Sequence, residues 1–148
     1  MRHALQGTAR LGTAALIAST VLLAAGCGSA GQAQHAGTTL RVNERDFKIS
    51  ATSQVVRPGK VDIAVDNHGP EAHELIVVRE DGSTLPMRSD GVTVDEDALQ
   101  KQEAGSLEPG EPGADRHLDV NLQPGRYILF CNMTGHYMGG MHTELVVG

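Results

Sequence analysis

Apolar and polar residues alternate along two segments of the chain, and this alternation predicts β-strands with one buried face. Residues 61–66 read VDIAVD, and residues 117–122 read HLDVNL. Successive side chains of a strand point to opposite sides, so each segment places most of its Val, Ile and Leu side chains on one face.

Other segments have the composition of short strands without clear alternation. The strongest are residues 73–80 (HELIVVRE), 126–131 (RYILFC) and 142–148 (HTELVVG), and weaker candidates are 40–42 and 47–49. The apolar run before Cys131 predicts burial on both faces of its strand. Turns are marked by Pro58-Gly59 and Pro124-Gly125, because Pro presets the first central position of a turn and Gly tolerates a positive φ at the second. Several short strands with turn signals predict an all-β fold, a β-sandwich.

One region interrupts the series of predicted strands. Residues 82–114 are acidic and contain three Pro and several Gly. Within it, the segment from Asp95 to Gly105 predicts one short helix, with Asp95 as its N-cap and further carboxylates in its first turn. We interpret residues 82–114 as an acidic excursion between two strands.

The first 26 residues have the features of an export signal. Arg2 and Arg10 accompany an apolar run over residues 11–26, which is too short for a comfortable membrane span. The run leads into LLAAGC, which resembles the lipobox of bacterial lipoproteins, so we expect lipidation of Cys27. Residues 27–39 are rich in Gly, Ala and Gln and predict a flexible tether. The expected organisation is therefore a signal peptide over 1–26, a tether over 27–39 and one folded domain over 40–148.

Composition and charge narrow the class of protein. The chain has two Phe, two Tyr and no Trp, so Val, Leu and Ile must form most of its core. Its net charge is −6, and removal of the signal would take away two Arg and make it more acidic. This balance argues against a nucleic-acid partner and promotes solubility. We interpret the negative charge as a solvated acidic surface, with docking of basic partners as the alternative, and expect a monomer.

The chain contains only two cysteines, Cys27 and Cys131. If Cys27 carries lipid, Cys131 has no partner for an intrachain disulfide. An unpaired cysteine in an exported domain is either a reactive thiol or has another function. Metal ligation is one such use. A Cys27–Cys131 disulfide is the alternative, and it requires the signal interpretation to be wrong.

The most informative segment is the loop CNMTGHYMGGM, which runs from Cys131 to Met141 between two predicted strands. It presents a thiolate, the imidazole of His136 and a thioether, and its three Gly residues allow tight turns. A second imidazole, that of His73, begins the apolar strand at 73–80. Soft sulfur ligands together with two imidazoles favour copper, whereas structural zinc is more often enclosed by several Cys and His.

The ordered set His73, Cys131, His136 and Met141 resembles the ligands of the cupredoxins, the small blue-copper proteins. Four residues separate Cys131 from His136 and four separate His136 from Met141, a spacing similar to that of the rusticyanin-like and sulfocyanin-like members. The resemblance covers residues 40 to 148. It implies a Greek-key β-sandwich of eight strands or fewer, with one copper ion held by the three strong ligands and by Met141 in the axial position.

Several residues compete with these ligands. His68 lies five residues before His73, in a turn-like segment, and Met133 and Met138 are alternatives to Met141. Cys131 itself could be a buried core residue, because alternation places it on the same strand face as Leu129. We prefer His73 because it adjoins the strand, and Met141 because Met138 is too close to His136 for an axial approach. His142 and His117 are expected at the surface.

The expected function is one-electron transfer by a copper ion that cycles between Cu(I) and Cu(II). The expected location is the outer face of a bacterial cell membrane, with lipidated Cys27 as the anchor and redox proteins as partners. A copper carrier or storage module is the alternative function. No acid–base pair is evident, and the absence of His-x-His and of a second Cys near Cys131 argues against multicopper enzymes and dinuclear copper sites. We therefore do not predict an enzyme.

Overall fold

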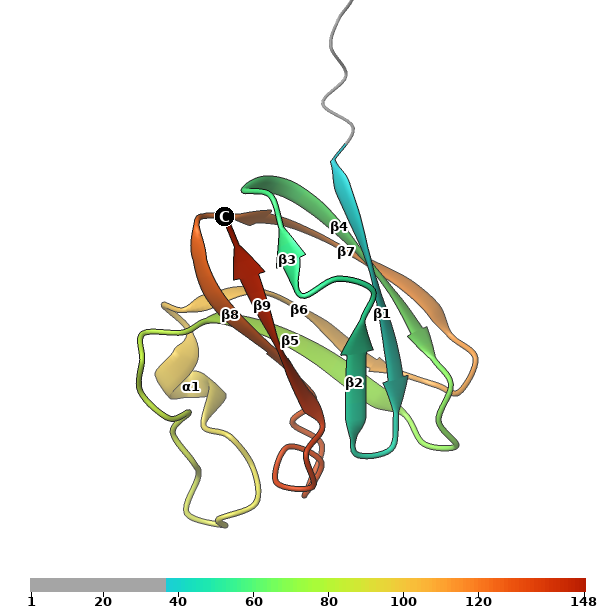
Figure 1. Cartoon of the computed structure of the whole chain (residues 1–148). Coiled ribbons are helices and arrows are strands. Elements are labelled where there is room, and N and C mark those ends of the chain that lie inside the picture. Colours follow the sequence, from blue (N-terminus) through green and yellow to red (C-terminus); the bar gives the residue numbers. More distant parts are fainter. Residues whose placement is uncertain (1–36) are drawn as a thin grey trace, which may run out of the picture. The chain divides into compact units, whose positions relative to one another are not determined.

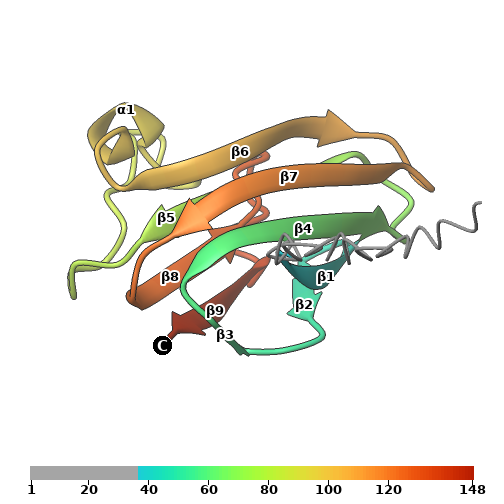
Figure 2. The same cartoon turned by 90° about the horizontal axis from the view of Figure 1, so that it is seen from above.

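A computed structural model describes residues 37–148, which form two packed β-sheets (Figures 1 and 2). The first sheet has the order β2-β1-β4-β7 and the second the order β3-β9-β8-β5-β6. The strands of the first sheet are β1 (Thr38–Arg45), β2 (Lys48–Ala51), β4 (Gly59–Asn67) and β7 (Asp115–Leu122). Those of the second are β3 (Val55–Val56), β5 (His73–Arg79), β6 (Glu103–Gly110), β8 (Gly125–Phe130) and β9 (His142–Val147). The predicted β-sandwich is confirmed, with nine strands among the described residues rather than eight or fewer.

The alternating segments occupy the strands they predicted. In β4 the side chains of Val61, Ile63 and Val65 are buried between the sheets, and in β7 so are those of Val120 and Leu122. Gly59 and Gly125, the second residues of the two Pro-Gly turns, have φ angles of 116° and 153°. The turn signals therefore mark the starts of β4 and β8, where a residue with a Cβ atom would be strained.

Strand β8 is buried on both faces, as its apolar composition predicts. Tyr127 and Leu129 face the other sheet and belong to the main core, which also contains Cys131. Ile128 and Phe130 face the opposite way and pack with residues of the excursion, among them Val94 and Leu99, in a second hydrophobic cluster. The excursion thus covers the outer face of the second sheet.

The structure corrects two details within and near the excursion. The expected helix over 95–105 is only one turn long, α1 (Glu96–Leu99), and Asp95 precedes it without a side-chain capping hydrogen bond. The residues that follow form strand β6, which pairs with β5. Phe47, expected in a strand over 47–49, instead lies in the β1–β2 turn.

The strand directions bring three chain segments to one end of the sandwich. Strand β8 is antiparallel to both β5 and β9, so the start of β5, the end of β8 and the start of β9 lie together. Strand β1 is parallel to β4, and the loop from β4 to β5 lies at the end where β1 turns into β2. His73, Cys131 and the loop before His142 therefore meet the β1–β2 turn.

The targeting interpretation falls outside the described residues. The signal peptide over 1–26, Cys27 and most of the tether over 27–39 remain predictions, and β1 begins at Thr38, two residues before the expected domain start. Within residues 37–148, no helix is long and apolar enough to cross a bilayer.

Candidate metal centre

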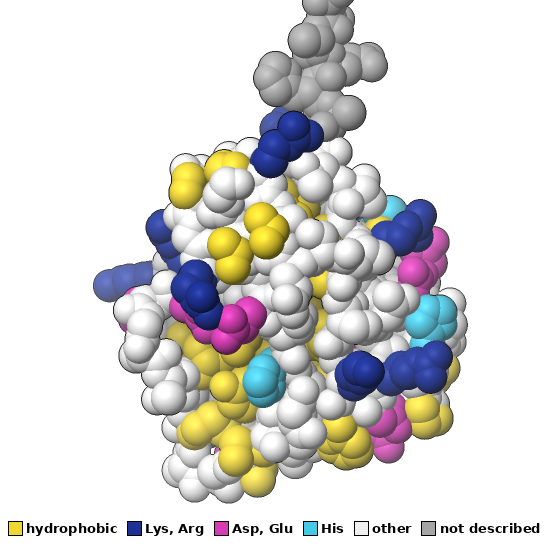
Figure 3. Space-filling model, in the orientation of Figure 1, with side chains coloured by type: hydrophobic (Ala, Val, Ile, Leu, Met, Phe, Trp, Pro, Cys, Tyr) yellow, Lys and Arg dark blue, Asp and Glu magenta, His cyan; other side chains and the backbone are white. Residues whose placement is uncertain are grey.

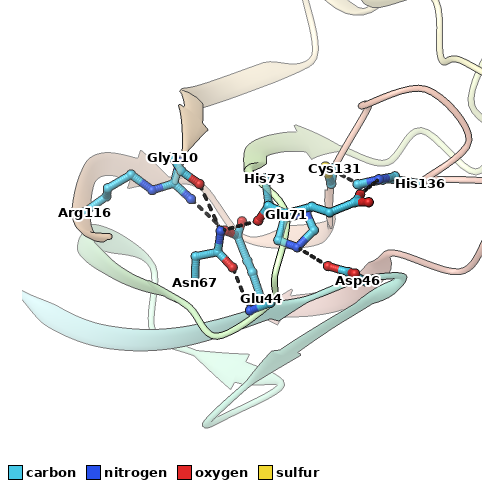
Figure 4. Close-up of polar contacts among 10 residues, drawn as sticks. Glu44, Asp46, Asn67, Glu71, His73, Gly110, Arg116, Cys131 and His136 are labelled. Carbon is cyan, nitrogen blue, oxygen red and sulfur yellow. Dashed lines mark hydrogen bonds and ion pairs between the residues drawn. The ribbon is translucent and has the colours of Figure 1, made fainter. Parts of the chain in front are cut away.

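Three of the predicted ligands converge at this end of the sandwich. One donor atom from each of His73, Cys131 and His136 lies within 4.8 Å of the others, and all three side chains are buried. The Sγ atom of Cys131 is 3.5 Å from Nδ1 of His136, and the two imidazole centroids are 5.2 Å apart. Figure 4 shows the two rings and the thiol side by side. The sequence therefore identified a set of residues that the fold brings together.

The Nδ1 atom of His73 tests whether the cluster suits a metal ion. It is fully buried and has no hydrogen-bond partner in the described structure. Buried polar atoms in folded proteins almost always have a partner, and a lone pair without one raises the free energy of the fold. A metal ion among the three donors would satisfy this atom.

The electrostatic environment favours the neutral forms of His73 and Cys131 in the metal-free protein. Burial lowers the pKa of His73 below its ordinary value, and neighbouring His136 lowers it further, while the Asp46 carboxylate opposes both effects. Burial raises the pKa of the Cys131 thiol to about 11. A neutral imidazole has a free lone pair, but the thiol must lose its proton before it can bind a metal ion.

The far nitrogens of both imidazoles face carboxylates. Nε2 of His73 is 3.1 Å from Oδ1 of Asp46, and Nε2 of His136 is 3.3 Å from Oε2 of Glu71 (Figure 4). In each ring Nε2 is thus turned away from the cluster and Nδ1 toward it. Such outer partners fix the orientation of metal-binding histidines.

Met141 is fully buried beside Cys131 in the main core. Its backbone N–H donates to the carbonyl of His136 at 2.9 Å, and its carbonyl accepts from the N–H of Cys131 at 3.1 Å. These bonds close the loop from Cys131 to Met141 and bring the backbone of Met141 next to that of both ligands in space. Its axial role remains a prediction.

The competing residues lie elsewhere. His68 is exposed, and its backbone N–H donates to the carbonyl of Glu44. Met138 is 60 % exposed, whereas Met133 is half-buried against the main core. His117 and His142 are exposed, as expected.

The sequence interpretation did not single out Asp46, Phe47 or Glu71, which contact the ligand imidazoles. Phe47 is 52 % exposed, and its ring meets that of His136 edge-to-face at 5.3 Å. A Cβ atom on Gly139 would collide with the Phe47 ring, so this glycine permits the close approach. Phe47 also has a φ of 59°, which is strained for a bulky residue. No local pattern links Asp46 or Phe47 to a ligand, because their contacts arise only when the two sheets pack.

The donor chemistry fits copper. Two imidazoles and a thiolate in one buried cluster, with the thioether residue Met141 at the end of the same loop, match the ligand set of a blue-copper site. In the described residues the only cysteine is Cys131, whereas structural zinc sites commonly use several. His73, Cys131 and His136 are therefore residues that could hold one copper ion.

The two-sheet architecture with this cluster at one end defines the cupredoxin fold, and comparison with solved structures supports it. Auracyanin A, a "blue" copper protein from Chloroflexus aurantiacus, is 16% identical over 76% of this chain and 99% of its own, with a TM-score of 0.59. A reduced auracyanin from Roseiflexus castenholzii is 16% identical over 76% and 98%, with a TM-score of 0.56. Rusticyanin from Thiobacillus ferrooxidans is 15% identical over 76% and 79%, with a TM-score of 0.54.

At these identities the comparison establishes the fold rather than the function. No protein-family model matches the chain, and no curated protein matches it in sequence. What the chain does must therefore be argued from its own residues.

Proposed function

We propose that the protein transfers single electrons through one type 1 copper ion. His73, Cys131 and His136 are the strong ligands, and Met141 is the axial ligand. The observation that carries the proposal is the buried, unpartnered Nδ1 of His73 next to the other two donors. A bound copper ion would supply the one-electron chemistry by cycling between Cu(I) and Cu(II).

The protein's own residues suit this role. His73 starts β5 and Cys131 directly follows β8. The loop that carries His136 is closed by backbone hydrogen bonds between Cys131, His136 and Met141, so a change in the charge of the centre would move the donors little. The edge of His136 is covered by the exposed Phe47 ring, so only a thin layer separates the ligand from solvent. Figure 3 shows hydrophobic side chains gathered at the lower end of the molecule, where the β8–β9 loop lies, and we propose that redox proteins dock there.

The burial of the donors favours electron transfer over the alternative of a copper carrier. A carrier must exchange its ion with another protein, which is easiest when the ligands are exposed. Here His73 and Cys131 are fully buried, and His136 is 5% exposed. We therefore propose a retained cofactor and no enzymatic activity of the copper site.

Spectroscopy of the purified domain tests this function. With Cu(II) added, the domain should show the intense visible band and the narrow copper hyperfine splitting of a cysteine-bound type 1 site. Cys131→Ser should lose the colour. A colourless protein with an ordinary tetragonal Cu(II) signal would refute the blue-copper assignment.

We further propose that lipid on Cys27 anchors the protein on the outer face of a bacterial cell membrane. The support is the sequence LLAAGC after a short apolar run, and a lipoprotein needs several acyl chains for stable retention. The test is cell fractionation of the full-length protein and its Cys27→Ser variant. Equal partitioning of the two into the membrane fraction would refute the anchor.

A further inference from the structure

The His73 imidazole is held between the ligand cluster and the Asp46 carboxylate. Oδ1 of Asp46 lies 3.1 Å from Nε2 of His73, across the gap between the two sheets. His73 begins β5 in one sheet, whereas Asp46 lies in the β1–β2 turn of the other. Figure 4 shows this single contact reaching the ring from the side opposite Cys131.

This contact selects one form of the ring. A neutral imidazole has one N–H, on either Nδ1 or Nε2, and a carboxylate can only accept a hydrogen bond. The bond to Asp46 therefore requires the hydrogen on Nε2, which leaves the Nδ1 lone pair free. That is the buried atom without a partner in the described structure.

The surrounding backbone encloses the pair. A Cβ atom on Gly69 would lie 2.7 Å from Oδ1 of Asp46 and 2.7 Å from Nε2 of His73, so only glycine fits over this bond. The N–H of Gly69 donates to Oδ1 of Asn67, and the Asn67 amide donates to the carbonyls of Glu71 and Gly110. The loop from β4 to β5 is thus fixed in place against the Asp46–His73 bond.

The second carboxylate contact differs in its exposure. The Glu71 side chain, 3.3 Å from Nε2 of His136, is 61% exposed, whereas that of Asp46 is 27% exposed. Water screens an exposed charge and weakens its hydrogen bonds. Glu71 therefore provides a matched control: a carboxylate beside a ligand imidazole that is not enclosed by the fold.

We propose that Asp46 is a positioning residue for the copper site, holding His73 with its hydrogen on Nε2 so that Nδ1 is committed to the metal. The proposal rests on the electron-transfer function stated above. The carboxylate also makes the imidazole a stronger donor, which favours Cu(II) over Cu(I) and lowers the reduction potential.

The first test uses the metal-free protein. Nitrogen-15 NMR of the histidine side chains should show His73 with its hydrogen on Nε2 in the wild type, in Asp46→Asn, whose amide oxygen can still accept, and in Glu71→Gln. Asp46→Ala should lose this form or mix it with the other. Gly69→Ala should do the same, because its methyl group would separate the pair without removing a polar group. An unchanged His73 spectrum in both Asp46→Ala and Gly69→Ala would overturn the proposal.

The second test uses the copper-loaded protein. Asp46→Ala should weaken Cu(II) binding by about 10- to 100-fold, as loss of an outer-shell partner typically does, and should raise the reduction potential. Asp46→Asn should keep the visible spectrum but also raise the potential, because the charge is lost and the bond is kept. Glu71→Gln should change both properties less, and an equal change would overturn the special role of Asp46.

The two tests separate this inference from the proposed function. If the metal-free NMR result is as expected but the copper-loaded domain is colourless, the blue-copper function fails while the Asp46–His73 pairing stands. If the domain is blue but both Asp46→Ala and Gly69→Ala leave the His73 spectrum unchanged, the function stands and the positioning role fails. Should Asp46→Ala not fold, Asp46→Asn and Gly69→Ala decide the question.

Discussion

The backbone N–H of Asn132 donates to Oε1 of Glu74 at 2.9 Å. Asn132 follows Cys131 and Glu74 follows His73, so this bond joins the two ligand-bearing strands beyond the ligands themselves. The Asn132 side chain also bonds the backbone of Val94 and the carboxylate of Glu96, which attaches the excursion to the same point.

We predict that Glu74→Ala destabilises the domain by about 1–3 kcal/mol, because the buried N–H of Asn132 would lose its acceptor. Glu74→Gln retains an acceptor oxygen and should cost less. Chemical denaturation measures the free energy of unfolding, and amide exchange at Asn132 locates the effect. Equal losses in the two variants would show that the hydrogen bond is not the cause.

We predict that Met141→Leu keeps copper and strong colour but raises the reduction potential, because a weak sulfur donor that stabilises Cu(II) is removed. The two side chains have similar volumes, so the fold should lose less than about 1.5 kcal/mol. Voltammetry of Met141→Leu, Met133→Leu and Met138→Leu measures the shifts. A larger shift from either control would move the axial assignment to that residue.

We predict that copper binding releases about one proton per ion between pH 7.5 and 9. Burial raises the pKa of the Cys131 thiol to about 11, so the thiol is protonated throughout this range and must ionise to bind. Affinity should therefore increase about tenfold per pH unit, since each unit corresponds to about 1.4 kcal/mol. Calorimetry in buffers of different ionisation enthalpy counts the protons, and Cys131→Ser should release none. A pH-independent affinity in the wild type would contradict the prediction.

We predict that the metal-free domain becomes less stable as the pH rises from 5 to 8, through Glu44. This carboxyl is fully buried against Arg116 at 2.6 Å, and burial raises its pKa from 4.5 to about 7. In this range the unfolded chain has already lost the proton that the folded chain retains, so stability falls as pH rises and the loss is complete above about pH 7. The contribution is about 3 kcal/mol at most.

The measurement for Glu44 is the free energy of unfolding as a function of pH. Glu44→Gln carries no ionisable group and should remove most of this slope, whereas Glu111→Gln, at an exposed position, should keep it. A Glu44→Gln variant with the wild-type slope would assign the pH dependence to other groups.

The sequence predicted those parts of the fold that local pattern controls. The alternation around Ile63 and Val120 located β4 and β7. The loop from Cys131 to Met141 could be recognised because a Cys, a His and a Met follow one another in it, with four residues between each and the next. His73 was recognised because it starts an apolar strand. Each of these signals lies within one short segment of the chain.

The remainder depends on packing between segments that are distant in sequence. Strand β6 contains Gly105 and Pro109 and has little apolar character, so only its pairing with β5 makes it a strand. Asp46 and Glu71 are ordinary polar residues of turns until the sheets close and bring them to the imidazoles. Contacts of this kind have no local signature in a single sequence.

Strand β1 separates the point where the chain enters the domain from the end that carries the ligands. It enters the domain at Thr38 and ends at the turn that carries Asp46, so its length of about 26 Å separates the entry point from the ligand end (Figure 1). If Cys27 is anchored in lipid, the residues before Thr38 span at most roughly 40 Å. Whenever the entry point at Thr38 faces the membrane, the copper end would lie on the opposite side of the domain, where partners could reach it from the aqueous side.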